Sequence, residues 1–296
     1  MKWFKWEMPF AGKNLRPSWI FKTSNLDRGL KIWRLLPAGE FFIVELRDTE
    51  KKITMFARIE QKNGKILWSG NPISDGASVA NEDNRWWITM NQIYKDVLFL
   101  QQFARPDMPT PGKVFALDIL TGKLLWQNIE ISLIGLSENS LYGLHRSHDL
   151  THGFLVELDY RTGEEEQRIS LDDPHVSEVI HDEEVRSHDV QMDGFIAPEP
   201  IEAHDLSHGL VPSHAINPSV IQLPSREIIG YYSDAGKDEK GISVYDACIM
   251  ITGAGKRLFG DVADHRVSSA LHDFFFVAND KLIYLRNSNE IVAVPL

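Results

Sequence analysis

The sequence predicts an all-β protein. Its apolar residues alternate with polar ones or come in runs of four to six rich in Val, Ile and aromatic residues, and helical periodicity is almost absent. The chain has 296 residues, of which 43% are hydrophobic and 25% charged, an ordinary globular balance. A chain of this length can bury a sizeable core without covalent cross-links. Its single cysteine, Cys248, cannot form an internal disulfide, which fits a reducing compartment.

Two groups of four short strands are predicted in the first half of the chain. Each candidate strand is a short run of alternating or consecutive apolar residues, rich in Val, Ile and aromatic residues. The first group is expected at 31–36, 40–47, 53–60 and 65–70, and the second at 86–90, 97–103, 113–119 and 123–127.

Three segments follow one template: Arg58–Trp68, Ala116–Trp126 and Glu157–Gln167. Each has a strand, an acidic residue, a glycine four positions later and a second strand, an order that predicts a β-hairpin. The glycine supplies the positive φ of the turn, and the polar residues before it can bond turn amides. The acid and glycine pairs are Glu60 with Gly64, Asp118 with Gly122, and Asp159 with Gly163.

The spacing of these turns predicts the number of units. Gly122 follows Gly64 by 58 residues, Gly163 follows by another 41, and Gly253 lies 90 further on, which is two steps of 45. Asn289 takes the turn position of a last unit of four short strands. Turns near 64, 122, 163, 208, 253 and 289 give six units. Four strands per unit at a period of about 40 to 45 predict a single β-propeller of about six four-stranded blades.

The ends and the middle of this propeller are less regular. Residues 1–30 form an N-terminal segment that could complete a seventh blade or clasp the C-terminal one, and residues 31–296 form the propeller. The stretch 171–225 is acidic, histidine-rich and interrupted by six prolines. It is either a degenerate blade with long loops or a loop inserted over one face of the ring.

The segment Ala116–Trp126, ALDILTGKLLW, resembles the repeat of PQQ-like (quinoprotein-type) β-propellers, Ala-x-Asp-x-x-Thr-Gly-Lys-x-x-Trp. The resemblance covers about two thirds of the chain and implies a single-domain bacterial member without the quinone site. It also implies that a Trp on the outermost strand docks on the next blade. The docking residues would be Trp68 and Trp126, with Gly64, Asp118, Gly122 and Gly163 as structural positions, whereas Gln167 departs from the pattern.

The same resemblance bears on cofactors. Quinone-binding dehydrogenases of this family are longer, exported, and use a disulfide between adjacent cysteines beside the cofactor. Because Cys248 is the single cysteine and no export signal is recognised, we do not expect bound PQQ. No other cofactor is expected, except that a divalent metal is left open.

Histidines suggest a different site. Nine of the eleven lie between 145 and 214, and the segments 147–153 (SHDLTHG) and 203–209 (AHDLSHG) are near copies. Imidazoles spaced at i and i+4 beside an aspartate can hold Zn, Mn or Fe. In other propellers a His and an Asp of each blade instead join a structural hydrogen-bond network, and both readings stay open. The candidate metal ligands are His148, His152, His204 and His208.

Charge excludes some functions. The net charge is −11, with sixteen acidic and three basic residues at 155–209 and eight basic and two acidic residues at 1–36. Nucleic acid is therefore not an expected ligand, because it requires a wide basic face. We expect no membrane span and, without a signal-like apolar run, a cytoplasmic protein.

Two functions follow as predictions. The first is a non-catalytic cytoplasmic binding or scaffold module for an unknown protein or small-molecule ligand. The alternative is a metal-dependent, hydrolase-like enzyme centred on the four histidines, with a divalent metal as its cofactor.

Overall fold

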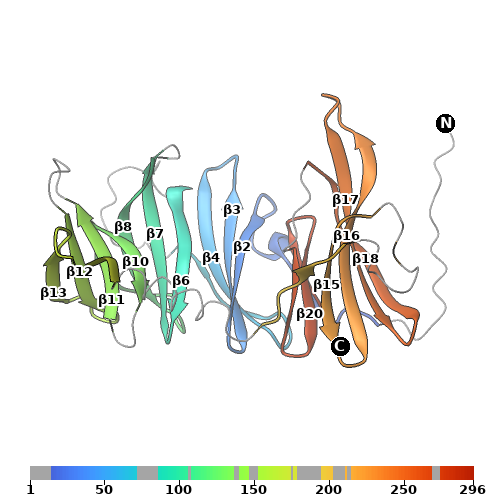
Figure 1. Cartoon of the computed structure of the whole chain (residues 1–296), viewed down its shortest axis with the longest axis horizontal. Helices are drawn as coiled ribbons and strands as arrows, with labels where there is room; N and C mark the ends of the chain where they lie inside the picture. Colours follow the sequence, from blue (N-terminus) through green and yellow to red (C-terminus); the bar gives the residue numbers. More distant parts are fainter. Residues whose placement is uncertain are drawn as a thin grey trace. The chain divides into compact units, whose positions relative to one another are not determined.

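The protein is all-β, as predicted. A computed structural model describes residues 15–71, 86–105, 108–136, 140–146, 153–174, 176–178, 195–202, 211, 215–268 and 274–296. Within these ranges the chain forms twenty-one strands in five antiparallel sheets (Figure 1). No helix in the described ranges is long and apolar enough to cross a membrane. The chain divides into two compact units, which we call the three-sheet unit (Thr23–Gly194) and the two-sheet unit (Met1–Lys22 with Phe195–Leu296).

The three-sheet unit begins with a short 3-10 turn (Thr23–Asn25) and continues as three antiparallel meanders, each with its strands in chain order. The strands predicted between 31 and 127 all form. The first sheet holds β2 (Lys31–Ala38), β3 (Phe41–Asp48), β4 (Ile53–Glu60) and β5 (Ile66–Gly70). The second sheet holds β6 (Ile88–Tyr94), β7 (Val97–Arg105), β8 (Met108–Asp118) and β9 (Leu124–Asn128). The third sheet holds β10 (Ile131–Leu136), β11 (Ser140–Arg146), β12 (Gly153–Asp159) and β13 (Glu165–Ser170).

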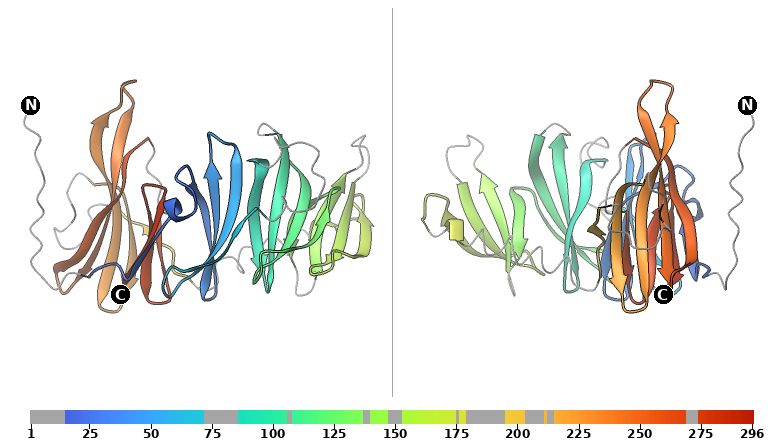
Figure 2. Two further views of the ribbon diagram at one scale, coloured as in Figure 1. Left: turned by 180° about the vertical axis from the view of Figure 1, so that it is seen from behind. Right: turned by 45° about the vertical axis from the view of Figure 1, so that its right-hand side comes forward.

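These three sheets pack face to face in chain order, as Figure 2 shows from behind. Alternating side chains of adjacent sheets meet in two apolar cores. Between the first and second sheets, Ile43 and Phe56 meet Leu98 and Phe115. We call this contact the first junction. Between the second and third sheets lies the second junction, where Phe99 and Val114 meet Leu133, Leu141 and Val156.

The same two irregularities recur in each of these sheets. A register shift interrupts the pairing of the first and second strands at Ile32/Arg34, Met90/Gln92 and Leu133/Gly135. A second shift precedes the hairpin between the third and fourth strands at Arg58/Ile59, Ala116/Leu117 and Glu157/Leu158. Bulges bend a strand and increase its twist, so their repetition gives the three sheets the same shape.

The two-sheet unit contains one sheet of five strands and one of four. The five-stranded sheet follows chain order, and its β16–β17 hairpin extends beyond the neighbouring strands (Figure 1). Its strands are β14 (Glu199–Pro200), β15 (Ile216–Leu223), β16 (Arg226–Lys237), β17 (Ser243–Gly253) and β18 (Lys256–Val267). β15 lies inside the stretch expected to be irregular.

The other sheet of this unit joins distant parts of the sequence. Its order is β1 (Trp19–Lys22), β21 (Glu290–Pro295), β20 (Lys281–Arg286) and β19 (Phe275–Ala278). β1 runs antiparallel to β21, with Trp19 opposite Ala293 and Lys22 opposite Glu290. The Lys22 ammonium also lies 2.8 Å from the Glu290 carboxylate. An N-terminal strand therefore completes a sheet of C-terminal strands.

The prediction for Asn289 was wrong. The Gly64 turn joins the third and fourth strands of its sheet. Asn289 instead lies in the turn between β20 and β21, which are the second and third strands of the last unit when β19 is counted as its first. The last unit accordingly supplies three strands, and β1 is the fourth. The reason is local: Asn287 and Ser288 form a tight turn with positive φ of 50° and 55°, and no acidic residue stands four positions before Asn289.

The number of blades is only partly answered. Four of the five described sheets have four strands, and β14 gives the other a fifth. The expected turn near 208 lies outside the described residues, so the sixth unit remains a prediction.

Candidate functional site

The predicted repeat positions form capped turns. Gly122 and Gly163 have φ of 71° and 73°, values that favour glycine. In the first turn the Thr121 amide donates to Asp118 Oδ1 at 2.7 Å, and in the second the Thr162 amide donates to Asp159 Oδ1 at 2.6 Å. Gly64 closes the corresponding turn of the first sheet with φ of 74°.

Each of these turns in the second and third sheets receives a tryptophan from the sheet before it. Trp68 of β5 donates from Nε1 to the Ile119 carbonyl at 2.9 Å, and a Cβ on Gly122 would lie 2.9 Å from its ring. Trp126 of β9 donates to the Tyr160 carbonyl at 3.1 Å, and a Cβ on Gly163 would lie 2.6 Å from its ring. The glycines therefore leave room for the indoles. Gln167, at the same place on β13, is exposed.

The predicted metal ligands His148, His152, His204 and His208 all lie outside the described residues. In the ranges that the structure does describe, no three His, Cys, Asp or Glu side chains come together as a metal site.

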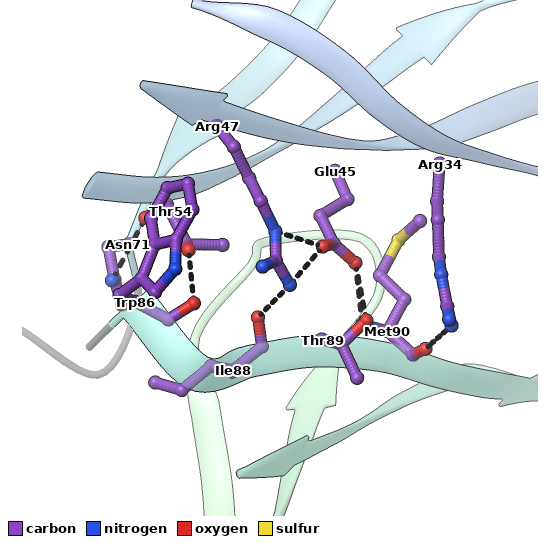
Figure 3. Close-up of polar contacts among 9 residues, drawn as sticks. All are labelled: Arg34, Glu45, Arg47, Thr54, Asn71, Trp86, Ile88, Thr89 and Met90. Carbon is purple, nitrogen blue, oxygen red and sulfur yellow. Dashed lines mark hydrogen bonds and ion pairs between the residues drawn. The ribbon is translucent and has the colours of Figure 1, made fainter. Parts of the chain in front are cut away.

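A buried charged cluster at the first junction was not predicted. Glu45 of β3 is fully buried, and Arg47, two residues further along the same strand, is 7% exposed. Arg47 Nε donates to Glu45 Oε1 at 2.7 Å. The other carboxylate oxygen, Oε2, accepts from the Thr89 hydroxyl and the Met90 amide, both at 2.9 Å (Figure 3). Both oxygens of Glu45 are therefore occupied.

Side chains of the first sheet also bond the free edge of β6. As Figure 3 shows, Arg47 Nη2 donates to the Ile88 carbonyl at 3.1 Å, and Arg34 Nη1 donates to the Met90 carbonyl at 3.0 Å. The Thr54 hydroxyl donates to the Trp86 carbonyl, just before β6, at 3.1 Å. Polar side chains thus take the place that a neighbouring strand would otherwise fill.

Two tryptophans enclose the Arg47 guanidinium. Its central carbon lies 4.9 Å from the Trp33 ring centroid and 5.1 Å from that of Trp86. The Lys52 ammonium lies 5.0 Å from the Trp86 ring. Both distances to Arg47 fall in the cation–π range. We call Trp33, Arg47, Trp86 and Lys52 the Trp–Arg stack.

One end of the stack reaches solvent. Trp86 is buried, whereas Trp33 is 53% exposed at the bulge of β2. Lys52 is exposed in the β3–β4 turn. Lys31 of β2, which stands opposite Arg47 of β3, is exposed as well. The geometry does not suit acid–base chemistry at Glu45, because both of its carboxylate oxygens already accept hydrogen bonds. It suits binding, because the bonded Arg47 supports the exposed Trp33 ring at the surface.

The sequence carried a signal for this cluster. The strand FFIVELRD is apolar apart from Glu45, Arg47 and Asp48, and Glu45 and Arg47 are two positions apart. Side chains two apart on a strand share a face, here the face of Ile43 that meets the second sheet. Two opposite charges on a core-facing side predict a buried ion pair.

Comparisons with known proteins give little further information. Residues 37–126 match the model of a family described as a domain of unknown function (DUF4905). No curated protein matches the chain.

Among solved structures, the chain is similar to BamB from Moraxella catarrhalis, with 11% identity, a TM-score of 0.21, and coverage of 88% of this chain and 71% of that one. It is similar to the β-propeller domain of the Trilobed protease from Pyrococcus furiosus, with 10% identity, a TM-score of 0.31, and coverage of 90% of this chain and 71% of that one. It is also similar to the quinohemoprotein alcohol dehydrogenase from Comamonas testosteroni, with 12% identity, a TM-score of 0.33, and coverage of 94% of this chain and 44% of that one. TM-scores this low do not establish a shared fold.

Proposed function

We propose that this protein is a non-catalytic binding module and that the solvent-exposed end of the Trp–Arg stack is its recognition surface. The observation that carries the proposal is Trp33, a large aromatic side chain that is 53% exposed although its ring packs on a buried guanidinium. Trp and Arg are the residues most enriched at the energetic centres of protein interfaces. A partner that covers Trp33 would gain the burial that the fold leaves incomplete.

Rigidity supports the same reading. Arg47 is fixed by Glu45 and by the Ile88 carbonyl, so the surface on which Trp33 rests is ordered before any partner arrives. A preorganised surface loses less conformational entropy on binding than a mobile one.

The proposed scaffold is a β-propeller. Its support is the repeated docking of Trp68 and Trp126, which stacks each sheet of the three-sheet unit on the next by the same contacts. Continued around a ring, such stacking would remove the open faces that single sheets leave. The alternative of a metal-dependent hydrolase remains a prediction, because its four histidines lie outside the described residues.

The test compares Trp33→Ala with Ile129→Ala. Ile129 is an apolar residue of the same unit, 59% exposed and outside the stack, so its removal controls for the loss of any exposed apolar side chain. Proteins cross-linked to the full chain in a cell extract would be quantified for both variants, after thermal melting shows that both are folded. We expect binding of a discrete set of proteins that survives Ile129→Ala and is lost in Trp33→Ala. Equal recovery by both variants would reject this surface.

A further inference from the structure

We infer that the partner segment that binds beside Trp33 is an acidic stretch of polypeptide; this inference rests on the proposed function. Three exposed cations belong to the same part of the sheet: Lys31 and Arg34 are close to Trp33 along β2, and Lys52 lies in the β3–β4 turn on the ring of Trp86. Lys31 stands opposite Arg47, and Lys52 is the member of the stack that lies on the ring of Trp86.

Three of the described acids near the stack are already paired. Glu45 is bonded to Arg47, and the Lys51 ammonium lies 2.7 Å from Asp27 and 3.4 Å from Asp48. These five charges, two positive and three negative, sum to −1.

An excess of positive charge remains. No described carboxylate lies within ion-pair distance of Lys31 or Lys52. Glu50, exposed in the β3–β4 turn, offsets one of the three exposed cations. Counted together with the five charges above, the surface keeps a net charge of about +1 beside an apolar ring, and Lys31 and Lys52 are the cations without a described acidic partner.

This pattern favours an acidic peptide over a nucleic acid. A phosphate polymer is held by a broad basic face, and here the excess is local in a chain of net charge −11. Carboxylates beside an apolar residue would complement Lys31 and Lys52 together with the exposed Trp33 ring. Such charges add mainly to the association rate and to specificity, and their effect weakens with salt.

The experiment measures fluorescence anisotropy of a labelled peptide of Glu and Asp residues around a central Leu, added to the full chain. A peptide with Gln and Asn in place of the acids is the ligand control. The test variant is Lys31→Glu with Lys52→Glu. The matched control is Lys62→Glu with Lys65→Glu, two exposed lysines at the other end of the same sheet that give the same change in charge.

We expect the acidic peptide to bind, to bind at least about tenfold more weakly to the test variant and at high salt, and to be nearly unaffected by the control. Equal binding of the amide peptide, or equal loss in both variants, would overturn the inference. So would concentration-dependent self-association in sedimentation that only the test variant abolishes, because the occupant would then be a second copy of this chain.

The two proposals fail differently. If Trp33→Ala loses its cross-linked partners while the acidic peptide does not bind, the binding surface stands and the acidic partner is rejected. If Trp33→Ala loses nothing, the surface itself is rejected.

Discussion

The two junctions of the three-sheet unit share one docking device and differ at the position of Glu45. At both, a tryptophan of the outermost strand donates to a backbone carbonyl of the next sheet and packs on its turn glycine. Strand register places Gln101 of the second sheet where Glu45 stands in the first, since each lies two residues beyond the partner of Arg58 or Ala116.

The equivalent side chains have different partners. The Glu45 carboxylate accepts hydrogen bonds from Arg47 Nε, the Thr89 hydroxyl and the Met90 amide. The Gln101 side-chain oxygen accepts one hydrogen bond, from the Asn91 side-chain amide at 2.8 Å. The Gln101 amide nitrogen is buried and has no hydrogen-bond partner among the described residues. The repeat therefore determines where sheets dock, and the residues at this second position are free to differ from one junction to the next. Differences in function between the junctions are therefore expected at the position of Glu45 and Gln101.

The largest expected effect is at the charged junction. Glu45→Gln keeps the shape of the side chain but leaves the buried Arg47 without its counter-charge, so we expect the free energy of unfolding to fall by about 3–5 kcal/mol. Urea denaturation measures it. Glu40→Gln, an exposed acid of the same sheet, should change it by less than about 0.5 kcal/mol. A loss from Glu45→Gln no greater than the control's would show that the two junctions do not differ in this way.

The docking tryptophans come next. Trp68→Ala and Trp126→Ala should each cost about 3 kcal/mol, because each removes a partly buried indole and its hydrogen bond at a junction. Trp→Phe at either position separates the two contributions and should cost roughly 1 kcal/mol less than Trp→Ala does. Similar losses at both junctions in chemical denaturation would support one shared device. A large loss at one junction alone would contradict it.

Gly163→Ala tests whether the turn glycine is needed for the indole or only for its φ. An added Cβ would lie 2.6 Å from Trp126, so the ring must move, and we expect a loss of about 2 kcal/mol. Gly39→Ala is the control, because Gly39 has φ of 58° with nothing near its missing Cβ. It should lose only about 1 kcal/mol. Equal melting temperatures for the two variants would remove the indole from the explanation.

Acid should weaken the capped turns. The pKa of Asp159 lies below its ordinary value of 3.8, first because the Thr162 amide donates to it. The stabilisation is therefore fully present above pH 3.8 and is lost as the pH falls through the lowered value. Asp159→Asn should remove this dependence and cost about 0.5 kcal/mol or less at neutral pH, since the site is largely solvated. Thermal melting between neutral and strongly acidic pH measures both. An unchanged acid slope would contradict the assignment.

A nearly neutral effect is expected at Gln101. Gln101→Met replaces a buried amide, whose nitrogen has no described partner, with an apolar side chain of similar length. The unfolding free energy should change by less than about 1 kcal/mol, because loss of the Asn91 bond is offset by relief of the unpaired donor. A cost near that of Glu45→Gln would erase the contrast between the junctions.

Much of this architecture was predictable because it depends on local chemistry. Alternating apolar residues gave the strands of the first two sheets, and the acid, glycine and tryptophan of Ala116–Trp126 define a hairpin with its docking contact. The position predicted for Asn289 was wrong because the same residue types form the turns of different hairpins. A turn signal does not show which pair of strands the turn joins.

The charged junction depends on tertiary contacts. Glu45 and Arg47 are close in sequence, but the Thr89 hydroxyl, the Met90 amide and the Trp86 ring come from a segment some forty residues away. Nothing in the sequence says that this segment packs on Glu45 and Arg47. The histidine hypothesis lies outside the described residues and remains a prediction.

The pairing of β1 with β21 has a consequence for how the protein folds. The Ser18 hydroxyl bonds the carbonyl of Ala293, 275 positions away, so this sheet cannot close until the C-terminal strands have been synthesised. Contacts this distant in sequence form slowly, because a long loop must be ordered before they stabilise anything. The three-sheet unit, built from neighbours in sequence, has no such delay. During translation the three-sheet unit should therefore become resistant to proteolysis first, at a stage when β1 has not yet paired with β21.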